Sequence, residues 1–361
     1  MPESRHSFLP ELHDAAPGGT GRSGPAGQAP DRRDGAVYVL DDQLRLAVDV
    51  ALATGRPLLL RGEPGSGKSS LAAFLARNLG WRYYEHVVSS RTTAQDLLWS
   101  FDSMRRLADA SSPGHEGGPA RLDDASYVEP GVMWWALDRD SALRRGRPAS
   151  PGDDMAAEPF GALNKNRRPE HAVVLIDEID KADPDVPNGL LVPLGSTEFL
   201  VTPIRFLVRQ QVAEDGLPPH LIVITTNEER ELPPAFLRRC IVHTLQAPKR
   251  PVLLAIARRH LAFGDPGREN NPGPENDPRR ENGPGPEDDP EELLGQLADK
   301  FFTLREEAEQ RGERPPSTAE YLDAVRVCRR LRVKVDDRTW QLVEPLVLVK
   351  NQNQRGLVAG P

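Results

Sequence analysis

Five short runs with the character of strands, separated by amphipathic stretches, dominate the first two thirds of the chain. The runs lie at 57–61, 82–88, 172–176, 221–226 and 241–245. Several are nearly continuous in Val, Ile and Leu, which is typical of strands buried on both faces of a parallel sheet. Segments with helical spacing, among them 41–54 and 68–79, alternate with these runs. The alternation predicts a doubly wound α/β domain over residues 35–247.

Beyond residue 248 the strand pattern stops and helical spacing takes over. Helices are predicted at 251–263, 291–311, 317–331 and 337–349. The third begins at Ser317 with the sequence Ser-Thr-Ala-Glu, a capping box in which two side chains satisfy backbone N–H groups at the helix start. We therefore expect a small all-helical domain over residues 248–350.

Two segments lack apolar periodicity and are rich in Gly, Pro and polar residues: 1–34 and 264–290. Neither holds enough apolar surface to offset the entropy lost on ordering, so we expect both to be disordered. The second then interrupts the helical domain after its first helix. A short C-terminal tail is expected over 351–361.

Composition narrows the class of protein. The formal net charge is −8, with 46 Lys and Arg against 54 Asp and Glu, and the chain has no large basic block. This balance makes nucleic acid an unlikely main partner. Only Cys240 and Cys328 are present, without paired or metal-ligand spacing, which favours a reducing compartment. No signal segment or apolar run of bilayer length is apparent, so we expect a cytoplasmic protein with no membrane partner.

The segment 62–69, Gly-Glu-Pro-Gly-Ser-Gly-Lys-Ser, matches the phosphate-binding pattern G-x-x-x-x-G-K-[ST]. It follows a predicted strand and opens a predicted helix. This context argues against the alternative, a Gly-rich turn that binds no ligand. The glycines let backbone N–H groups turn toward a phosphate, Lys68 can reach the β- and γ-phosphates, and Ser69 can hold Mg²⁺. The candidate nucleotide-binding residues are Gly62, Glu63, Pro64, Gly65, Ser66, Gly67, Lys68, Ser69 and Ser70.

Two carboxylates end the apolar run at 172–176. Asp177 and Glu178 are expected at the carboxyl edge of the sheet, beside the loop at 62–69. Asp177 is predicted to orient Mg²⁺ through its water shell, and Glu178 to polarise a water for attack on the γ-phosphate as a general base. A solvated acidic turn is the alternative, and the presence of the phosphate loop argues against it.

Two weaker signals follow the next apolar run. Asn227 comes directly after the strand at 221–226 and can hydrogen-bond the attacking water or the γ-phosphate, although an Asn there is more often a turn residue. Arg238 and Arg239 end a short helix, where a guanidinium could stabilise charge on a neighbouring subunit's nucleotide. Surface arginines that favour the helix dipole are the alternative, which stays open for Arg238.

Trp134 and Trp135 form an adjacent aromatic pair on a predicted amphipathic helix. Such a pair can grip a substrate or a partner, but it more often anchors a core. We favour the core interpretation.

These motifs, in this order, resemble those of AAA+ ATPases, and three further segments are similar to the MoxR branch of that family. The segments are Arg91–Leu98, Tyr127–Ala136 and Leu190–Phe199, and the resemblance covers roughly residues 38–332. It implies a P-loop NTPase AAA+ core, a parallel sheet sandwiched by helices, followed by a small helical lid domain.

The resemblance also implies function. Members of this family bind ATP and Mg²⁺, hydrolyse ATP, form hexameric rings and remodel partner proteins as chaperone-like machines, often partners with a von Willebrand factor A domain. By resemblance Asn227 is the first sensor and Arg239 the trans-acting finger, with Arg238 a second candidate. The family's second sensor is a lid arginine, where this chain has Ala319. Arg314 and Arg326 are alternatives between which spacing does not decide.

Two departures leave alternatives open. The stretches 108–122 and 144–168 lengthen the region before the Asp-Glu strand, either as substrate-facing loops of a ring or as solvent-exposed variable loops. The absent lid arginine leaves a second functional hypothesis, an ATP-binding switch without turnover in a signalling or bacterial defence assembly. A DNA-acting motor is disfavoured by the acidic balance and by the lack of a helix-turn-helix extension.

Overall fold

The computed structural model describes residues 35–111, 122–150, 155–264, 290–335 and 337–349. The chain forms two compact units. The first contains residues 40–62 and 68–245, and the second contains 36–39, 63–67 and the chain from 246 onward. The segments expected to be disordered, 1–34 and nearly all of 264–290, lie outside the described residues, as does the tail at 351–361.

The first unit is built on a five-stranded parallel sheet with the strand order β2–β5–β8–β1–β9. The strands are β1 (Leu58–Arg61), β2 (Trp81–Val87), β5 (Arg168–Asp177), β8 (His220–Thr225) and β9 (Ile241–Thr244). The predicted parallel α/β fold is thereby confirmed. β8 lies between β1 and β5, so the carboxyl ends of these three strands meet at one edge of the sheet.

Helices flank this sheet, as the sequence pattern predicts. They are α1 (Asp42–Thr54), α2 (Lys68–Leu79), α3 (Ala94–Leu98), α5 (Val132–Leu137), α6 (Arg139–Leu143), α7 (Gly161–Asn164), α8 (Asp185–Gly189), α9 (Leu191–Ser196) and α10 (Pro234–Leu237). α1 starts at the N-cap Asp41, whose side chain accepts from Leu44 N–H, and ends where Gly55 adopts a left-handed conformation. α2 is rich in Ala and Leu, strong helix formers, and buries most of them.

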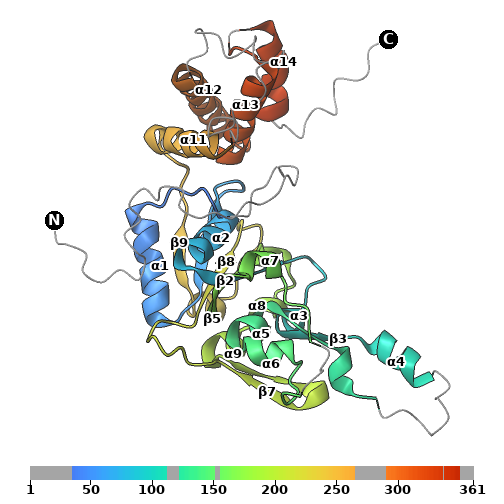
Figure 1. Ribbon diagram of the computed structural model, residues 1–361. Helices are drawn as coiled ribbons and strands as arrows, with labels where there is room; N and C mark the ends of the chain where they lie inside the picture. Colours follow the sequence, from blue (N-terminus) through green and yellow to red (C-terminus); the bar gives the residue numbers. More distant parts are fainter. Residues whose placement is uncertain (1–34, 112–121, 151–154, 265–289, 336, 350–361) are drawn as a thin grey trace, which may run out of the picture. The chain divides into compact units, whose positions relative to one another are not determined.

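Two small antiparallel ribbons extend the first unit. One pairs β3 (Trp99–Phe101) with β4 (Val128–Pro130), and the other pairs β6 (Glu198–Val201) with β7 (Phe206–Arg209). Between β3 and β4 the chain forms α4 (Ser103–Ser111), which projects from the body of this unit (Figure 1) and has no buried residue.

The tryptophan pair belongs to the core of the first unit. Trp134 is fully buried and Trp135 is 2% exposed. The Trp134 indole N–H donates to the Ser141 hydroxyl (2.8 Å), and that of Trp135 donates to the Pro130 carbonyl (3.1 Å). Burying both rings while satisfying both N–H groups is how aromatic residues stabilise a core, so the core interpretation is confirmed.

The edge strand β2 is covered by residues from the lengthened stretch before β5. Asn164, which is fully buried, accepts from Tyr83 N–H (2.8 Å) and donates to the Tyr83 carbonyl (3.1 Å). The amide thus replaces a neighbouring strand, which protects an edge that would otherwise present unpaired backbone groups.

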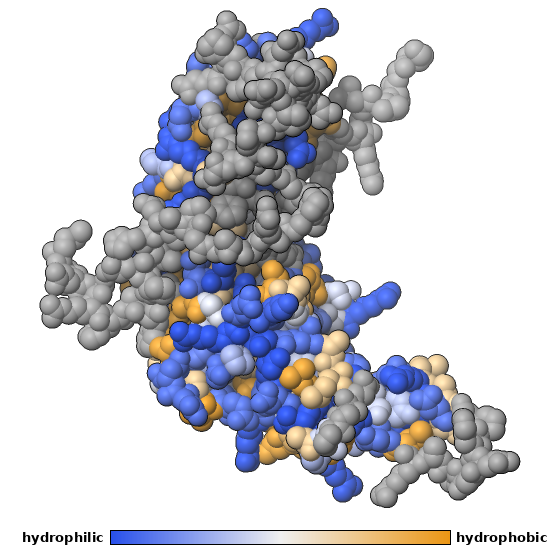
Figure 2. Space-filling model, in the orientation of Figure 1, coloured by the Kyte–Doolittle hydropathy of each residue, from blue (hydrophilic) through white to orange (hydrophobic). Residues whose placement is uncertain are grey.

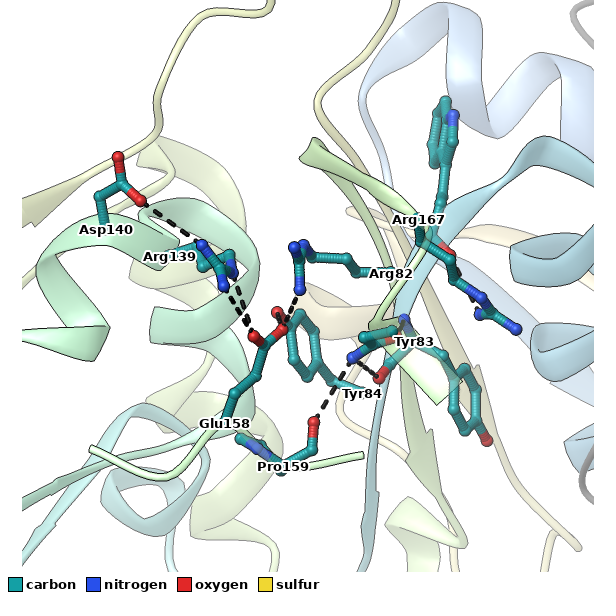
Figure 3. Close-up of polar contacts among 10 residues, drawn as sticks. Arg82, Tyr83, Tyr84, Arg139, Asp140, Glu158, Pro159 and Arg167 are labelled. Atoms are coloured by element: carbon teal, nitrogen blue, oxygen red, sulfur yellow. Dashed lines mark hydrogen bonds and ion pairs between the residues drawn. The ribbon is translucent and has the colours of Figure 1, made fainter. Parts of the chain in front are cut away.

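A mostly buried ionic cluster fastens the same stretch to the sheet (Figure 3). Glu158 forms ion pairs with Arg82 of β2 and with Arg139 of α6 (2.9 Å), and it accepts from the Tyr84 hydroxyl (2.9 Å). Burial by itself would raise the pKa of Glu158, but the hydrogen bonds from Arg139 and Tyr84 and the two positive charges lower it overall. Within 155–168, Glu158 and Asn164 are thus paired inside the fold, while Met155, Phe160 and Leu163 are exposed.

The second unit is helical. Its helices are α11 (Arg250–Gly264), α12 (Pro290–Arg311), α13 (Thr318–Leu331) and α14 (Arg338–Val347), packed around a core that includes Phe301, Tyr321 and Trp340. The predicted capping box is confirmed, since Ser317 N–H donates to the Glu320 carboxylate (2.7 Å) and the Ser317 side chain accepts at the helix start.

On the face of the first unit shown in Figure 2, hydrophobic residues form separate spots among hydrophilic ones. Among the described residues, no helix combines the length and the apolar character needed to cross a bilayer.

Candidate functional site

Lys68 and Ser69 open α2 directly after the glycine-rich segment. Lys68 is 6% exposed, and its ammonium donates to the Gly62 carbonyl (2.7 Å). Gly62 has φ +138, and a β-carbon there would lie 2.6 Å from the Leu245 carbonyl oxygen. Only glycine fits this position. The backbone conformation of Gly62 places its carbonyl where the Lys68 ammonium can donate to it.

Ser69 reaches the last residue of β5. Its hydroxyl donates to Asp177 Oδ1 (2.7 Å), and the hydroxyl of Thr225, the last residue of β8, donates to the same oxygen (2.6 Å). Asp177 is only 4% exposed. The strand order explains the meeting, because β8 lies between β5, which ends in Asp177, and β1, which leads into the loop and helix that carry Ser69.

Glu178 lies beside this cluster in a left-handed conformation, φ 60, which is uncommon for a residue with a side chain. Its N–H donates to Thr225 Oγ1 (2.8 Å). One carboxylate oxygen accepts from Asn227 Nδ2 (3.2 Å) and the other pairs with Lys181 Nζ (2.5 Å). The structure therefore brings Lys68, Ser69, Asp177, Glu178 and Asn227 to one edge of the sheet.

The electrostatics of this edge are dominated by carboxylates. Burial lowers the pKa of Lys68, while the negative charges of Asp177, Asp180, Glu178 and Glu228 act in the opposite direction. Lys181 pairs with Glu178 and Arg61 pairs with Glu228, so three cationic side chains face these four carboxylates.

The donor set fits Mg²⁺ better than a transition metal. Ser69 and Asp177 offer a hydroxyl and a carboxylate oxygen, the hard ligands that Mg²⁺ prefers. The described residues contain no cluster of three or more His, Cys, Asp or Glu able to enclose a metal. Mg²⁺ is commonly held by one or two protein oxygens together with substrate phosphates and water, which is the arrangement these two residues allow.

Sequence reasoning did not single out two residues of this edge. Thr225 bridges Asp177 and the Glu178 N–H, and Asp180 accepts from the backbone of the segment that carries Asn227. A signal for Thr225 was present, since a hydroxyl ends an otherwise aliphatic strand immediately before Thr226 and Asn227. Nothing in the sequence indicated that Asp180 contacts the backbone after β8.

Arg238 and Arg239 lie outside this group of contacts. Both are exposed at the end of α10. Arg239 donates to the Ala235 carbonyl (3.3 Å), and the Arg238 carbonyl accepts from Arg56 (3.3 Å).

The residues 63–67 belong to the second unit, where they meet the start of α13. A β-carbon added to Gly65 would lie 2.5 Å from the Ser317 hydroxyl oxygen and 3.4 Å from the Ala319 β-carbon. The Ser66 hydroxyl is buried and has no hydrogen-bond partner within the described chain. An unpaired buried hydroxyl is costly without a ligand, so this loop fits a site that a polar group completes.

An arginine of the second unit that the sequence analysis did not consider contacts this loop. Arg305, 7% exposed, donates to the Glu63 carboxylate (3.0 Å) and to the Pro316 carbonyl (2.7 Å). The two arginines considered from the sequence instead form local pairs, Arg314 with Glu320 and Arg326 with Asp323.

Comparison with known proteins identifies the family. The model of the AAA domain, dynein-related subfamily, matches residues 57–240, more than half of the chain. The chain belongs to the AAA domain family. The matched range of this AAA protein includes every candidate site residue from Gly62 to Arg239, and AAA domains are P-loop nucleotide-binding domains of ATPases.

A crystal structure of a "putative ATPase" from Cytophaga hutchinsonii matches at 15% identity and a TM-score of 0.37, over 63% of this chain. The AAA protein spans about half of that structure, 52% of its length. No curated protein matches the chain.

Proposed function

We propose that this AAA protein is a MoxR-like ATPase that works as a homo-hexameric ring and remodels a partner protein. One observation carries the proposal: Asp177 meets the Ser69 hydroxyl while the adjacent Glu178 meets Asn227. A cation ligand and a base thereby lie at the edge where Lys68 begins its helix, which are the parts that phosphoryl transfer from ATP needs.

Each residue of the sheet edge has a separate role in the proposed hydrolysis of ATP. Lys68 binds the β- and γ-phosphates, and Ser69 and Asp177 hold Mg²⁺, which neutralises phosphate charge when it is bound. Glu178 takes the proton of the attacking water, and Asn227 orients that water. A carboxylate has about four acceptor positions, so Glu178 can keep its bond to Asn227 while it accepts from water.

Residues outside the sheet edge complete the proposal. Arg239 acts in trans on a neighbouring subunit's nucleotide, with Arg238 as second candidate, and their exposure leaves both accessible to a neighbour. Residues 35–247 form the AAA+ domain, and 248–350 form a lid that converts ATP turnover into movement. The client is a protein, for which a von Willebrand factor A domain is the first candidate.

A second candidate function is an ATP-binding switch without turnover, in a signalling or defence assembly. The observation that favours it is Ala319, whose methyl group faces Gly65 of the loop at the position where the family has a sensor arginine. Without that guanidinium, the lid has less charge with which to respond to the γ-phosphate.

The test combines mass measurement with phosphate release. Glu178→Gln should assemble into a hexamer with ATP and Mg²⁺. At ring-forming concentrations Arg239→Ala should keep ATP binding and lose about a thousandfold in phosphate release, as removal of a trans-acting arginine does. Arg238→Ala is the matched comparison and should lose far less.

Three results would change the proposal. Wild-type turnover by Arg239→Ala in the assembled ring would remove the finger assignment. A larger loss in Arg238→Ala would move the role to that residue. Wild-type phosphate release no faster than that of Glu178→Gln would favour the switch.

A further inference from the structure

The segment that follows β8 is held in one conformation by side-chain oxygens. Glu228 has φ 60, a conformation that costs free energy for a residue with a side chain. Its N–H donates to Thr226 Oγ1 (2.9 Å), and its carboxylate pairs with Arg61 (3.4 Å). A residue keeps such an unfavourable backbone conformation only where several surrounding contacts fix it. We therefore expect further contacts that hold Glu228.

Asp180 supplies that support. Its Oδ2 accepts from Asn227 N–H (3.1 Å) and from Glu229 N–H (2.9 Å), on either side of Glu228. Asp180 is 3% exposed, so water does not compete for these two hydrogen bonds. One buried carboxylate oxygen therefore holds the backbone N–H groups on both sides of Glu228.

This clamp joins the two halves of the candidate catalytic apparatus. Asp180 lies in the short 3-10 turn Ile179–Lys181, immediately after Glu178. On the other side, the Asn227 side chain donates to Glu178 Oε1 (3.2 Å). The distance between the Asn227 amide and the base thus depends on the bond from the Asn227 backbone to Asp180.

We propose that Asp180 is a positioning residue that sets Asn227 against Glu178, so that the two act on one water. The inference rests on the proposed ATP hydrolysis. It depends on an acceptor atom at Oδ2 and not on the charge of Asp180. The second oxygen, Oδ1, is buried without a hydrogen-bond partner among the described residues, so an asparagine could keep its oxygen toward the two N–H groups.

The experiment measures kcat and KM for ATP from steady-state phosphate release at ring-forming concentrations. Asp180→Ala should lower kcat about tenfold or more and change KM less than about twofold, because the lost contact acts on the chemical step. Asp180→Asn should restore kcat to within about threefold of wild type. In an Asn227→Ala background, Asp180→Ala should cost less than about twofold, since its effect passes through Asn227.

Each contrary result is specific. Wild-type kcat in Asp180→Ala would overturn the proposal, and so would an equal loss in Asp180→Asn or additive losses in the double variant. If Asp180→Ala does not fold, Asp180→Ser takes its place, because its shorter side chain withdraws the acceptor, and the same losses are expected. Glu178→Gln, assayed alongside, should be inactive. If it hydrolyses ATP at the wild-type rate, the assignment of Glu178 as the base fails, and if the wild-type protein releases no phosphate above background, the proposed function fails, each independently of Asp180.

Discussion

Two buried carboxylates of the first unit differ in what surrounds them. Asp177, at the carboxyl end of β5, accepts from the hydroxyls of Ser69 and Thr225. Glu158, against the edge strand β2, is paired with Arg82 and Arg139 (Figure 3). Both side chains are largely removed from solvent.

The partners of the two carboxylates indicate which one stabilises the fold and which one serves the candidate site. Two guanidiniums pair with Glu158 inside the fold, and a buried ion needs such partners in order to stabilise a structure. Asp177 instead accepts from two hydroxyls and lies near the Lys68 ammonium, whose pKa its charge acts to raise. Hydroxyl and carboxylate oxygens are the ligands that Mg²⁺ prefers. Burial alone does not mark a site, and the chemistry of the partners does.

The largest effect on stability should come from breaking the structural cluster. Glu158→Ala leaves two arginines without their shared partner, and loss of one partner of a buried pair costs about 3–5 kcal/mol. Urea denaturation measures the free energy of unfolding. ATP affinity of the folded fraction should stay at the wild-type value.

The matched control for that variant is Glu198→Ala, which removes an exposed ion pair with Arg209. It should cost less than about 1 kcal/mol. Equal losses in Glu158→Ala and Glu198→Ala would show that the cluster does not hold the stretch before β5.

Asp177→Asn should have the opposite effect to Glu158→Ala, with a small change in stability and a large loss of activity. The amide oxygen can still accept from Ser69 and Thr225, so the free energy of unfolding should change by less than about 1 kcal/mol. Phosphate release should fall about a hundredfold because the charge that holds the cation is gone. A titration of phosphate release against Mg²⁺ measures the loss. Normal turnover in a destabilised Asp177→Asn protein would contradict the comparison.

A smaller effect, dependent on pH, should come from His220 at the start of β8. Burial lowers the pKa of His220 to about 4, from 6.5 for an exposed imidazole. Between these values the unfolded chain binds a proton that the folded chain does not, so stability falls as the pH drops below 6.5. From pH 7 to pH 5 the loss should be about 2 kcal/mol, at 1.36 kcal/mol for each pKa unit.

His220→Leu isolates this contribution, because urea midpoints should then depend less on pH between 7 and 5. Glu158 does not act in this window. Its pKa is lowered from 4.5, so its stabilisation is present above that value and is lost only as the pH falls further. An unchanged slope in His220→Leu would show that the imidazole is not held neutral.

Much of the fold could be predicted because the signals are local. The aliphatic run of β5, the Gly-rich segment before α2 and the Ser317–Glu320 capping box each lie within a few residues. The motif residues of the candidate site are local in the same sense. Asp177 and Glu178 follow directly from the end of their strand.

The remaining features depend on contacts between distant residues. That Thr225 meets Asp177 follows from β8 lying between β1 and β5, and the order of strands is not written in any one segment. The pairing of Glu158 with Arg82 joins residues 76 positions apart. The contact between Arg305 and Glu63 spans 242 positions. Spacing along the chain could not select these partners.

The most direct test of the account is phosphate release by Glu178→Gln, measured with ATP binding by calorimetry. We expect binding within about threefold of wild type and release at least about a hundredfold slower, the usual cost of losing a general base. Lys68→Ala should abolish binding, and Glu170→Gln, an exposed change at the other end of β5, should match wild type in both assays. ATP hydrolysis by Glu178→Gln at the wild-type rate would contradict the account.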